Sequence, residues 1–272
     1  MNKIDFAIVV TAEMCNPNGD PLNGNRPRTD FEGHGYITDV AIKRKIRNRL
    51  QDAGESILVV ENSRSTDGLF SIKDRVRAQK ELMQLEKVKD INGFYGEACR
   101  TWIDVRAFGQ MFPFKDLFGG TTIPVRGPVS VGMARSLQTV DILDYTISKS
   151  CNSEENSIKK DSSTIGARHV VSKAAYVAYG SIFPQLADKT GFSENDAELI
   201  KNAMATLFEN DASAARPSGS MTAALYWWEH DCPTGRKSSA LVHKSLNIAP
   251  MDKYPYYACD PDSIAGIKLS IL

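Results

Sequence analysis

The sequence predicts an α+β fold, a ferredoxin-like or RRM-like sheet with elaborations. Two observations lead to this fold class. Segments with the two-residue period of strands and segments with the period of helices follow one another in an order that contains a β-α-β-β-α-β core. The 272 residues are 42% hydrophobic and 24% charged, as in ordinary globular proteins. We expect the helices to cover one face of the sheet only, which leaves the other face free to bind a ligand.

Residues 4–11 begin the predicted sheet. Their side chains alternate with a period of two, and because the second set is also fairly apolar, this strand should lie in the centre of the sheet. The following residues, 16–28, contain two Asn-Gly turns and three prolines. They therefore form a loop that continues neither a strand nor a helix.

Two predicted helices flank the sheet. The first has apolar side chains at every fourth residue, namely Ile42, Ile46 and Leu50. Thr38 or Asp39 is its expected cap, and Gly54 ends it. The second begins at Ser193, with Asp196 three residues later as in a capping box. Its buried stripe is marked by Leu199, Ala203 and Leu207.

The remaining segments add strands and two insertions. Residues 61–100 are polar and rich in Lys and Arg, and we expect a helical insertion there. The low-complexity stretch 148–163 is predicted to be the mobile tip of a long hairpin. Strand character is found at 57–60, 102–106, 125–133, 142–147, 170–179, 221–229 and 266–272.

The net charge of zero hides two regions of opposite charge. Residues 26–49 carry seven basic and three acidic side chains, a net charge of +4, whereas residues 186–211 carry two lysines and six acids, a net charge of −4. Lys43, Arg44 and Arg47 share one side of the first predicted helix. Such a face attracts phosphates, and the loop beside it offers backbone N–H groups to the same ligand. A solvated surface helix would carry the same charges.

Other function classes find little support in the sequence. No apolar stretch approaches the roughly 20 residues that span a bilayer, and the apolar run near the N-terminus is too short and too acidic for export. The five cysteines include no C-x-x-C pair, which favours a reduced, cytoplasmic protein. His230, Cys232 and His243 match no zinc spacing, and the common nucleophile, phosphate-binding and metalloprotease motifs are absent. We expect neither a metal nor a cofactor.

Two weaker signals remain open. Asp20, Asp30 and Asp104 have the chemistry for acid–base catalysis, although an aspartate beside Gly or Pro in a loop is usually a turn residue. The run Arg126-Gly127-Pro128 permits close approach of a ligand backbone to the sheet, but a simple tight turn or bulge would use the same residues.

Several longer motifs together resemble the backbone subunit of the type I-C CRISPR Cascade complex, a member of the RAMP superfamily. They follow the family's order and cover nearly the whole chain: NPNGDP at 16–21, NGNRPR at 23–28, KRKIRNR at 43–49, DVRAFGQ at 104–110, RGPV at 126–129, LFENDA at 207–212 and YWWEH at 226–230.

This resemblance implies a hand-shaped protein whose single RRM-like palm spans residues 1–272. The finger would be the helical insertion at 61–100, and the thumb a β-hairpin at 140–170. Copies of such a subunit stack head to tail along the CRISPR RNA, which requires a heterologous interface that does not close. The target DNA reads the bases, whereas the protein holds the RNA backbone and performs no catalysis.

The resemblance also implies partners and RNA-binding residues. The partners are CRISPR RNA, the target DNA strand paired to it, copies of the chain itself, and the large, small and 5′-handle-processing subunits of Cascade. No membrane is involved. The RNA-contacting residues would come from the loop, the first helix, one strand entrance and the base of the thumb: Asn18, Arg26, Arg28, Thr38, Lys43, Arg44, Arg47, Arg126, Arg168 and His169.

Two other functions remain as alternatives. Related backbone subunits of type III effectors cleave target RNA with a loop aspartate and a divalent metal, and Asp20 or Asp30 could take that role. A general RNA-binding module outside CRISPR interference would also account for the fold and the basic helix.

Overall fold

The computed structural model describes residues 1–113, 118–148 and 165–272. The strands are β1 Ile4–Cys15, β2 Gly19–Asp20, β3 Arg26–Pro27, β4 His34–Ile37, β5 Gln110–Phe112, β6 Ile123–Val125, β7 Val129–Val131, β8 Ala134–Thr139, β9 Ile142–Ser148, β10 Ile165–Ile182, β11 Met221–His230, β12 Ile248–Pro250, β13 Tyr257–Cys259 and β14 Ile267–Ile271. The α-helices are α1 Asp39–Asp52, α2 Ile72–Ala78, α3 Lys80–Lys87, α4 Ile91–Thr101, α5 Ile103–Phe108, α6 Pro184–Thr190, α7 Glu194–Ala205 and α8 Ser239–Lys244.

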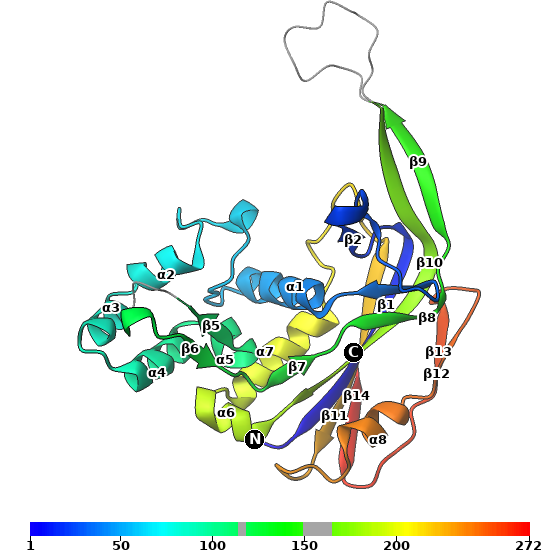
Figure 1. The fold of residues 1–272 in the computed structure, drawn as a ribbon. Coiled ribbons are helices and arrows are strands. Elements are labelled where there is room, and N and C mark those ends of the chain that lie inside the picture. Colours follow the sequence, from blue (N-terminus) through cyan, green and yellow to red (C-terminus); the bar gives the residue numbers. More distant parts are fainter. Residues whose placement is uncertain (114–117, 149–164) are drawn as a thin grey trace, which may run out of the picture.

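One antiparallel sheet dominates the fold (Figure 1). Its strand order is β14-β11-β1-β10-β8-β4, and β7 and β9 also pair with β10. In β1, Ile8 lies opposite Ala178 of β10 and Leu225 of β11. The prediction of a central first strand is therefore confirmed, and so is the α+β class.

The helices α1 and α7 cover one face of this sheet. The N-cap Thr38 accepts a hydrogen bond from the Ala41 N–H, and Ser193 forms a capping box with Asp196, as the sequence predicted. The apolar stripe of α1 and the even-numbered side chains of β1 meet in the main core: Ile42, Ile46, Leu50, Phe6, Ile8 and Val10. Of the predicted stripe in the second helix, Ala203 and Leu207 lie in the main core, whereas Leu199 is only partly buried and Ile200 is fully buried instead.

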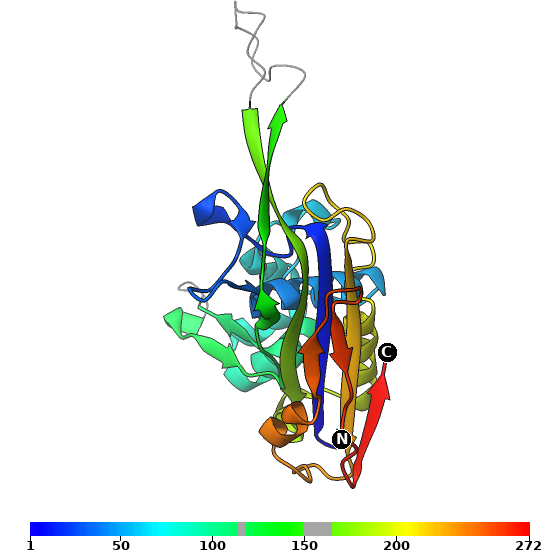
Figure 2. The same ribbon diagram turned by 90° about the vertical axis from the view of Figure 1, so that its right-hand side faces the viewer.

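The opposite face of the sheet is covered too, so the expectation of a free face is wrong. Figure 2 shows α8 and the hairpin β12–β13, in orange, in front of the sheet. They bury a second set of apolar side chains, among them Ala7, Val9, Tyr226, Trp228, Val242 and Leu246. Because both sets of side chains on β1 are apolar, both faces of the sheet require a cover.

Two predicted strands, 57–60 and 102–106, are absent from the structure. Residues 57–60 form irregular chain, and most of 102–106 lies in helix α5. This short helix is buried on two sides, since Ile103 packs into the main core and Val105 into a second cluster beside α4. In this segment Ile103 and Val105 alternate with Asp104 and Arg106, and this period of two is also typical of a strand, which explains the error.

Residues 125–133, predicted as one strand, contain the last residue of β6 and the whole of β7. Val125 ends β6, which pairs with β5, whereas Val129 begins β7, which pairs with β10. Between them the chain passes very close to the end of α5: a Cβ placed on Gly127 would lie 2.2 Å from the Ala107 carbonyl oxygen. Only glycine permits this approach.

The two insertions flank the sheet in Figure 1. Helices α2, α3 and α4 lie between residues 72 and 101, where the sequence predicted helical structure. Strands β9 and β10 form a hairpin that projects beyond the rest of the molecule. Residues 149–164, most of the predicted hairpin tip, lie outside the described residues. None of the described helices is both long and apolar enough to cross a membrane.

A buried polar cluster ties β1 to β10 and β11. Asp5 is fully buried, accepts a hydrogen bond of 2.5 Å from Ser181 Oγ and lies 2.8 Å from His230 Nε2. Burial tends to raise the pKa of Asp5, but its hydrogen bonds to Ser181, Ser239 and His230 and the charge of Lys3 outweigh burial, so the pKa is lowered below its ordinary value of 3.8.

This lowered pKa predicts acid sensitivity. The charged form of Asp5 stabilises the fold above the ordinary carboxyl pKa of 3.8, and this contribution is lost as the pH falls below it. We expect the free energy of unfolding to decrease below about pH 4, and to decrease less steeply in Asp5→Asn. Urea unfolding at a series of pH values measures this difference. Parallel pH profiles for the two proteins would contradict it.

Candidate nucleic-acid interface

The loop after β1 is joined directly to the start of α1. Asn18 Oδ1 accepts hydrogen bonds from the Thr38 backbone N–H at 3.0 Å and from Thr38 Oγ1 at 3.1 Å. Thr38 Oγ1 in turn caps the helix at Ala41. Two of the predicted RNA-binding residues therefore meet, and their polar groups fix the loop against the positive end of the helix dipole.

Arg26 connects the same loop to the base of the β9–β10 hairpin. Its Nη1 lies 3.0 Å from Asp144 Oδ2 and 3.1 Å from His169 Nδ1, and His169 is also 2.7 Å from Asp144. The hydrogen bond with His169, and then that from Arg26, lower the pKa of Asp144. Arg26 and His169, 143 residues apart in the sequence, thus form one cluster with a carboxylate between them.

Several buried polar atoms near the end of β1 lack a partner within the described residues: Asn16 Oδ1, Arg28 Nε and Ser220 Oγ. Asn16 N–H bonds to the Ala215 carbonyl, and Cys15 Sγ to the Ser220 carbonyl, so the loop 211–220 lies against the loop after β1. Arg28 also pairs with Asp20 at 3.4 Å. Because buried polar groups are normally paired, these atoms are exceptions that set the end of β1 apart from the rest of the core.

The cationic side chains of α1 differ in their exposure and in their ion-pair partners. Lys43 pairs with Asp39 at 3.0 Å and Arg44 with Glu61 at 3.4 Å, both at the surface. Arg47 is more constrained, since only 13% of its side chain is exposed and its Nε donates to Asp104 Oδ2 at 2.9 Å. Its guanidinium also lies 5.1 Å from the centre of the Phe108 ring. Lys43 and Arg44 therefore remain the more accessible cations.

Arg126 and Arg168 differ from the other predicted cations, because neither has an ion-pair partner among the residues that the structure describes. Arg126 is exposed on the link between β6 and β7, where the backbone of Gly109 approaches it closely. Arg168 lies in β10 opposite Tyr145 of β9. Since side chains alternate along a strand, Arg168 points to the other face of the hairpin from its neighbour His169. The predicted residues thus form several clusters and not one compact pocket.

The two oppositely charged regions of the sequence neutralise each other in part. Lys45 points away from the surface, pairs with Asp211 and lies 5.2 Å from the centre of the Phe208 ring. Burial lowers the pKa of Lys45 in spite of this pairing. Arg49 Nε donates to Thr206 Oγ1 at 3.1 Å. Part of the basic stripe therefore packs against the acidic segment and is not available to a ligand.

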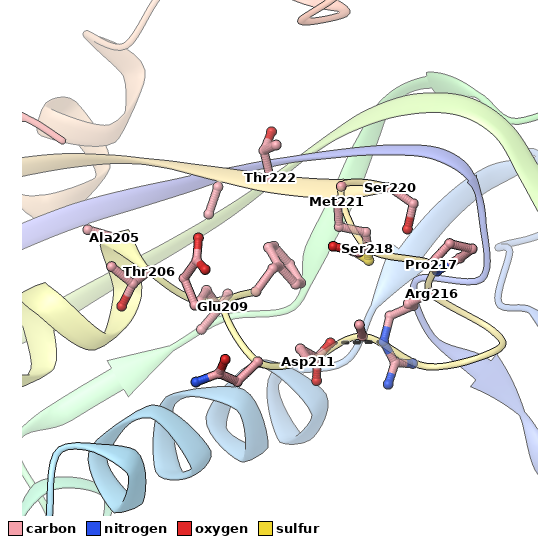
Figure 3. A pocket seen from close by; sticks show the side chains of 16 residues that line it. Ala205, Thr206, Glu209, Asp211, Arg216, Pro217, Ser218, Ser220, Met221 and Thr222 are labelled. Carbon is pink, nitrogen blue, oxygen red and sulfur yellow. Dashed lines mark hydrogen bonds and ion pairs between the residues drawn. The ribbon is translucent and has the colours of Figure 1, made fainter.

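Asp211 also binds Arg216 at 2.9 Å, beside a cavity of about 520 Å³ between the end of α7 and the start of β11 (Figure 3). Sequence reasoning missed Arg216 as a candidate. The only local signal is the breaker-rich run at 216–219, Arg-Pro-Ser-Gly. The nearby Ser220 carries one of the unpaired buried oxygens, and the backbone of this loop is bonded to Asn16 through the Ala215 carbonyl.

The three candidate acid–base residues have partners of their own. Asp20 caps a short turn by accepting from Leu22 N–H, Asp30 pairs with Arg135, and Asp104 is buried against Arg47. Within residues 1–113, 118–148 and 165–272, no three His, Cys, Asp or Glu side chains are grouped so that they could hold a metal ion.

Comparisons with known proteins agree with this architecture. A solved structure named "CRISPR RNA-guided surveillance complex, pre-nicking" shares the fold with a TM-score of 0.51 at 12% identity, over 84% of this chain and 78% of that one. A curated relative, the CRISPR-associated protein Cas7 of Haloferax volcanii, is 32% identical over 166 residues, 60% of this chain. The aligned part is 47% of that relative, so the chain spans about half its length. The family model for CRISPR-associated protein Cas7 matches residues 2–267, and the chain therefore belongs to the Cas7 family.

Proposed function

We propose that this chain is a CRISPR RNA-binding backbone subunit of the type I-C Cascade interference complex. Several copies oligomerise head to tail along the guide RNA and present it for pairing with target DNA, together with the large, small and 5′-handle-processing subunits. The chain works in the cytoplasm, holds the RNA through its phosphates and riboses, and needs neither a metal nor a cofactor. Membership of the Cas7 family supports this function.

The observation that carries the proposal is the meeting of three distant segments. The loop after β1, the start of α1 and the base of the β9–β10 hairpin are joined through the pairs Asn18–Thr38 and Arg26–His169. Each segment brings cations or backbone N–H groups to this junction, which is suited to a ligand with repeated phosphates. Unpaired buried polar atoms of Asn16 and Arg28 lie in the loop after β1, and that of Ser220 lies in the neighbouring loop 211–220.

The architecture supports the palm, finger and thumb interpretation. The order β11-β1-β10-β8, with α1 and α7 on one face, is what a ferredoxin-like or RRM-like palm requires. Helices α2 to α4 would serve as the finger, and β9 and β10 as the thumb. The projection of this hairpin beyond the sheet suits contact with a neighbouring copy (Figure 1).

A non-catalytic role is favoured over RNA cleavage by the positions of the loop aspartates. Asp20 and Asp30 both have structural partners, Leu22 N–H and Arg28 for the first, and Arg135 with two backbone N–H groups for the second. Metal-dependent cleavage of a target RNA that disappears in Asp20→Ala or Asp30→Ala would instead support the type III-like alternative.

The proposal is tested by isolating the RNA that the protein protects. The chain is expressed with a CRISPR array and the processing subunit, purified, digested with ribonuclease, and the surviving RNA is sized. We expect RNA of discrete guide length in a high-mass complex, and none when the array is replaced by an unrelated transcript. Recovery of the chain as a small, RNA-free species from cells that contain the array would contradict the proposed function.

A further inference from the structure

Phe31 is an exposed aromatic side chain at the tip of the turn between β3 and β4. Its side chain is 98% exposed, while the backbone around it is fixed by the pairing of β4 with β8. Exposure of one apolar side chain is common, but an aromatic ring held away from the protein surface adds nothing to the packing of its own chain. A function in binding would account for such a ring.

The turn that carries Phe31 is held by a double ion pair. Arg135 Nε donates to Asp30 Oδ2 at 2.9 Å, and Arg135 Nη2 to Glu32 Oε2 at 2.5 Å. Asp30 Oδ1 accepts two further hydrogen bonds, from the N–H groups of Glu32 at 3.0 Å and His34 at 2.9 Å. The residues on both sides of Phe31 are thus joined to one guanidinium, so the backbone that carries the ring is already ordered and loses little entropy on binding.

The charges around Phe31 favour a protein partner over a nucleic acid. Asp30 and Glu32 carry two negative charges and Arg135 carries one positive charge, so the turn has a net charge of −1. This net negative charge repels a phosphate backbone. A complementary surface would combine exposed apolar side chains with an unneutralised cation.

The β9–β10 hairpin of the same chain offers that combination. Leu143, Tyr145 and Ile147 alternate along β9, point to one face of the hairpin and are exposed. Arg168 lies opposite Tyr145 on the same face and has no ion-pair partner in the described part of the chain. Phe31 is almost fully exposed in its own chain, so it does not contact this face within one molecule.

We propose that Phe31 of one copy docks on the hairpin face of a second copy, defined by Leu143, Tyr145, Ile147 and Arg168. The ring supplies the apolar anchor, and Asp30 and Glu32 face Arg168. Because the turn and the hairpin face are different surfaces of one chain, the contact is heterologous and can repeat from copy to copy. This inference rests on the proposed multi-copy assembly and names the contact that builds it.

Photo-crosslinking in the assembled complex tests the contact directly. The photoreactive residue p-benzoylphenylalanine replaces Phe31, the complex is purified with its RNA, irradiated, digested and analysed by mass spectrometry. We expect crosslinks to residues 142–147 or 166–170 of another copy. Crosslinks that reach only RNA, only another subunit, or another part of a second copy would overturn the inference. Absence of RNA from the purified wild-type complex would count against the proposed function and is a separate readout.

Substitution gives a second, quantitative readout. We expect Phe31→Ser to weaken association between copies about tenfold or more, and Phe31→Trp to retain it, because anchor residues of this kind dominate interface energies. Arg135→Ala should also weaken association although Phe31 is still present, because it removes the ion pairs that hold Asp30 and Glu32. Phe70→Ser is the matched control, because Phe70 is 64% exposed and lies near α2. Sedimentation of the complexes compares the variants, and equal effects of Phe31→Ser and Phe70→Ser would contradict the proposal.

Discussion

Asp104→Ala is expected to lower the free energy of unfolding by about 3–5 kcal/mol. The carboxylate is almost completely buried and accepts hydrogen bonds from the backbone N–H groups of Leu58 at 2.8 Å and Val59 at 3.1 Å. It also accepts from Arg47 Nε at 2.9 Å. Alanine would leave two backbone donors and one largely buried guanidinium without their acceptor, and each loss costs free energy.

Urea unfolding of Asp104→Ala beside Asp188→Ala measures this effect. Asp188 is exposed on α6, so its replacement should change the free energy of unfolding by no more than about 0.5 kcal/mol. Asp104→Asn keeps one acceptor oxygen and the shape of the side chain, and we expect an intermediate loss. A change in Asp104→Ala as small as that in Asp188→Ala would show that residues 57–60 are held in another way.

Simultaneous replacement of Arg26, Lys43 and Arg126 by alanine is expected to weaken RNA binding roughly 100-fold at 0.1 M salt. Each cation that contacts a phosphate releases counterions, so the slope of log affinity against log salt should fall by about 2 for three contacts on a single strand. The loss should be similar for unrelated RNA sequences, because phosphates carry no sequence information.

The choice of these three residues leaves the buried Arg47–Asp104 ion pair intact. Arg47 lies on the same cationic side of α1, but its removal would leave the buried Asp104 carboxylate without its ion-pair partner. A loss of stability would then be added to any loss of RNA binding. An RNA too short for two copies keeps assembly out of the measurement. The matched control replaces three exposed lysines on other surfaces, Lys189, Lys237 and Lys268, for the same change in net charge. Equal losses in both triple variants, or a loss confined to one RNA sequence, would contradict specific phosphate contacts.

The sequence predicted the parts of the fold that depend on local patterns. The period of two in β1 and the stripe Ile42, Ile46 and Leu50 in α1 are direct consequences of which side chains must leave water. The caps at Thr38 and Ser193 satisfy helix N–H groups within three residues, so their signals are local as well. Motif order along the chain also indicated a backbone subunit of a CRISPR Cascade complex, and the family match over residues 2–267 shows the Cas7 family.

The sequence proposes the candidate interface as a set of residues but does not predict their arrangement. Charge and motif singled out Arg26 and His169 separately, yet their meeting depends on where β10 places the hairpin base relative to the loop after β1. Lys45 and Lys43 look alike in the sequence, but Lys45 lies over Phe208 and pairs with Asp211, 166 residues away. Arg216 is connected to these residues by its ion pair with the same carboxylate, that of Asp211.

The amino-acid sequence by itself determined which segments form β1, α1, α7 and the hairpin strands, because periodicity and caps act between residues a few positions apart. Only the tertiary structure decided that 103–108 is a helix, that the second face of the sheet is covered by residues 239–259, and which cations stay accessible. The physical reason is that a sequence pattern shows only that an apolar side chain must be buried or that a charged side chain must be paired or solvated. The identity of the partner is decided by packing between residues far apart in the chain.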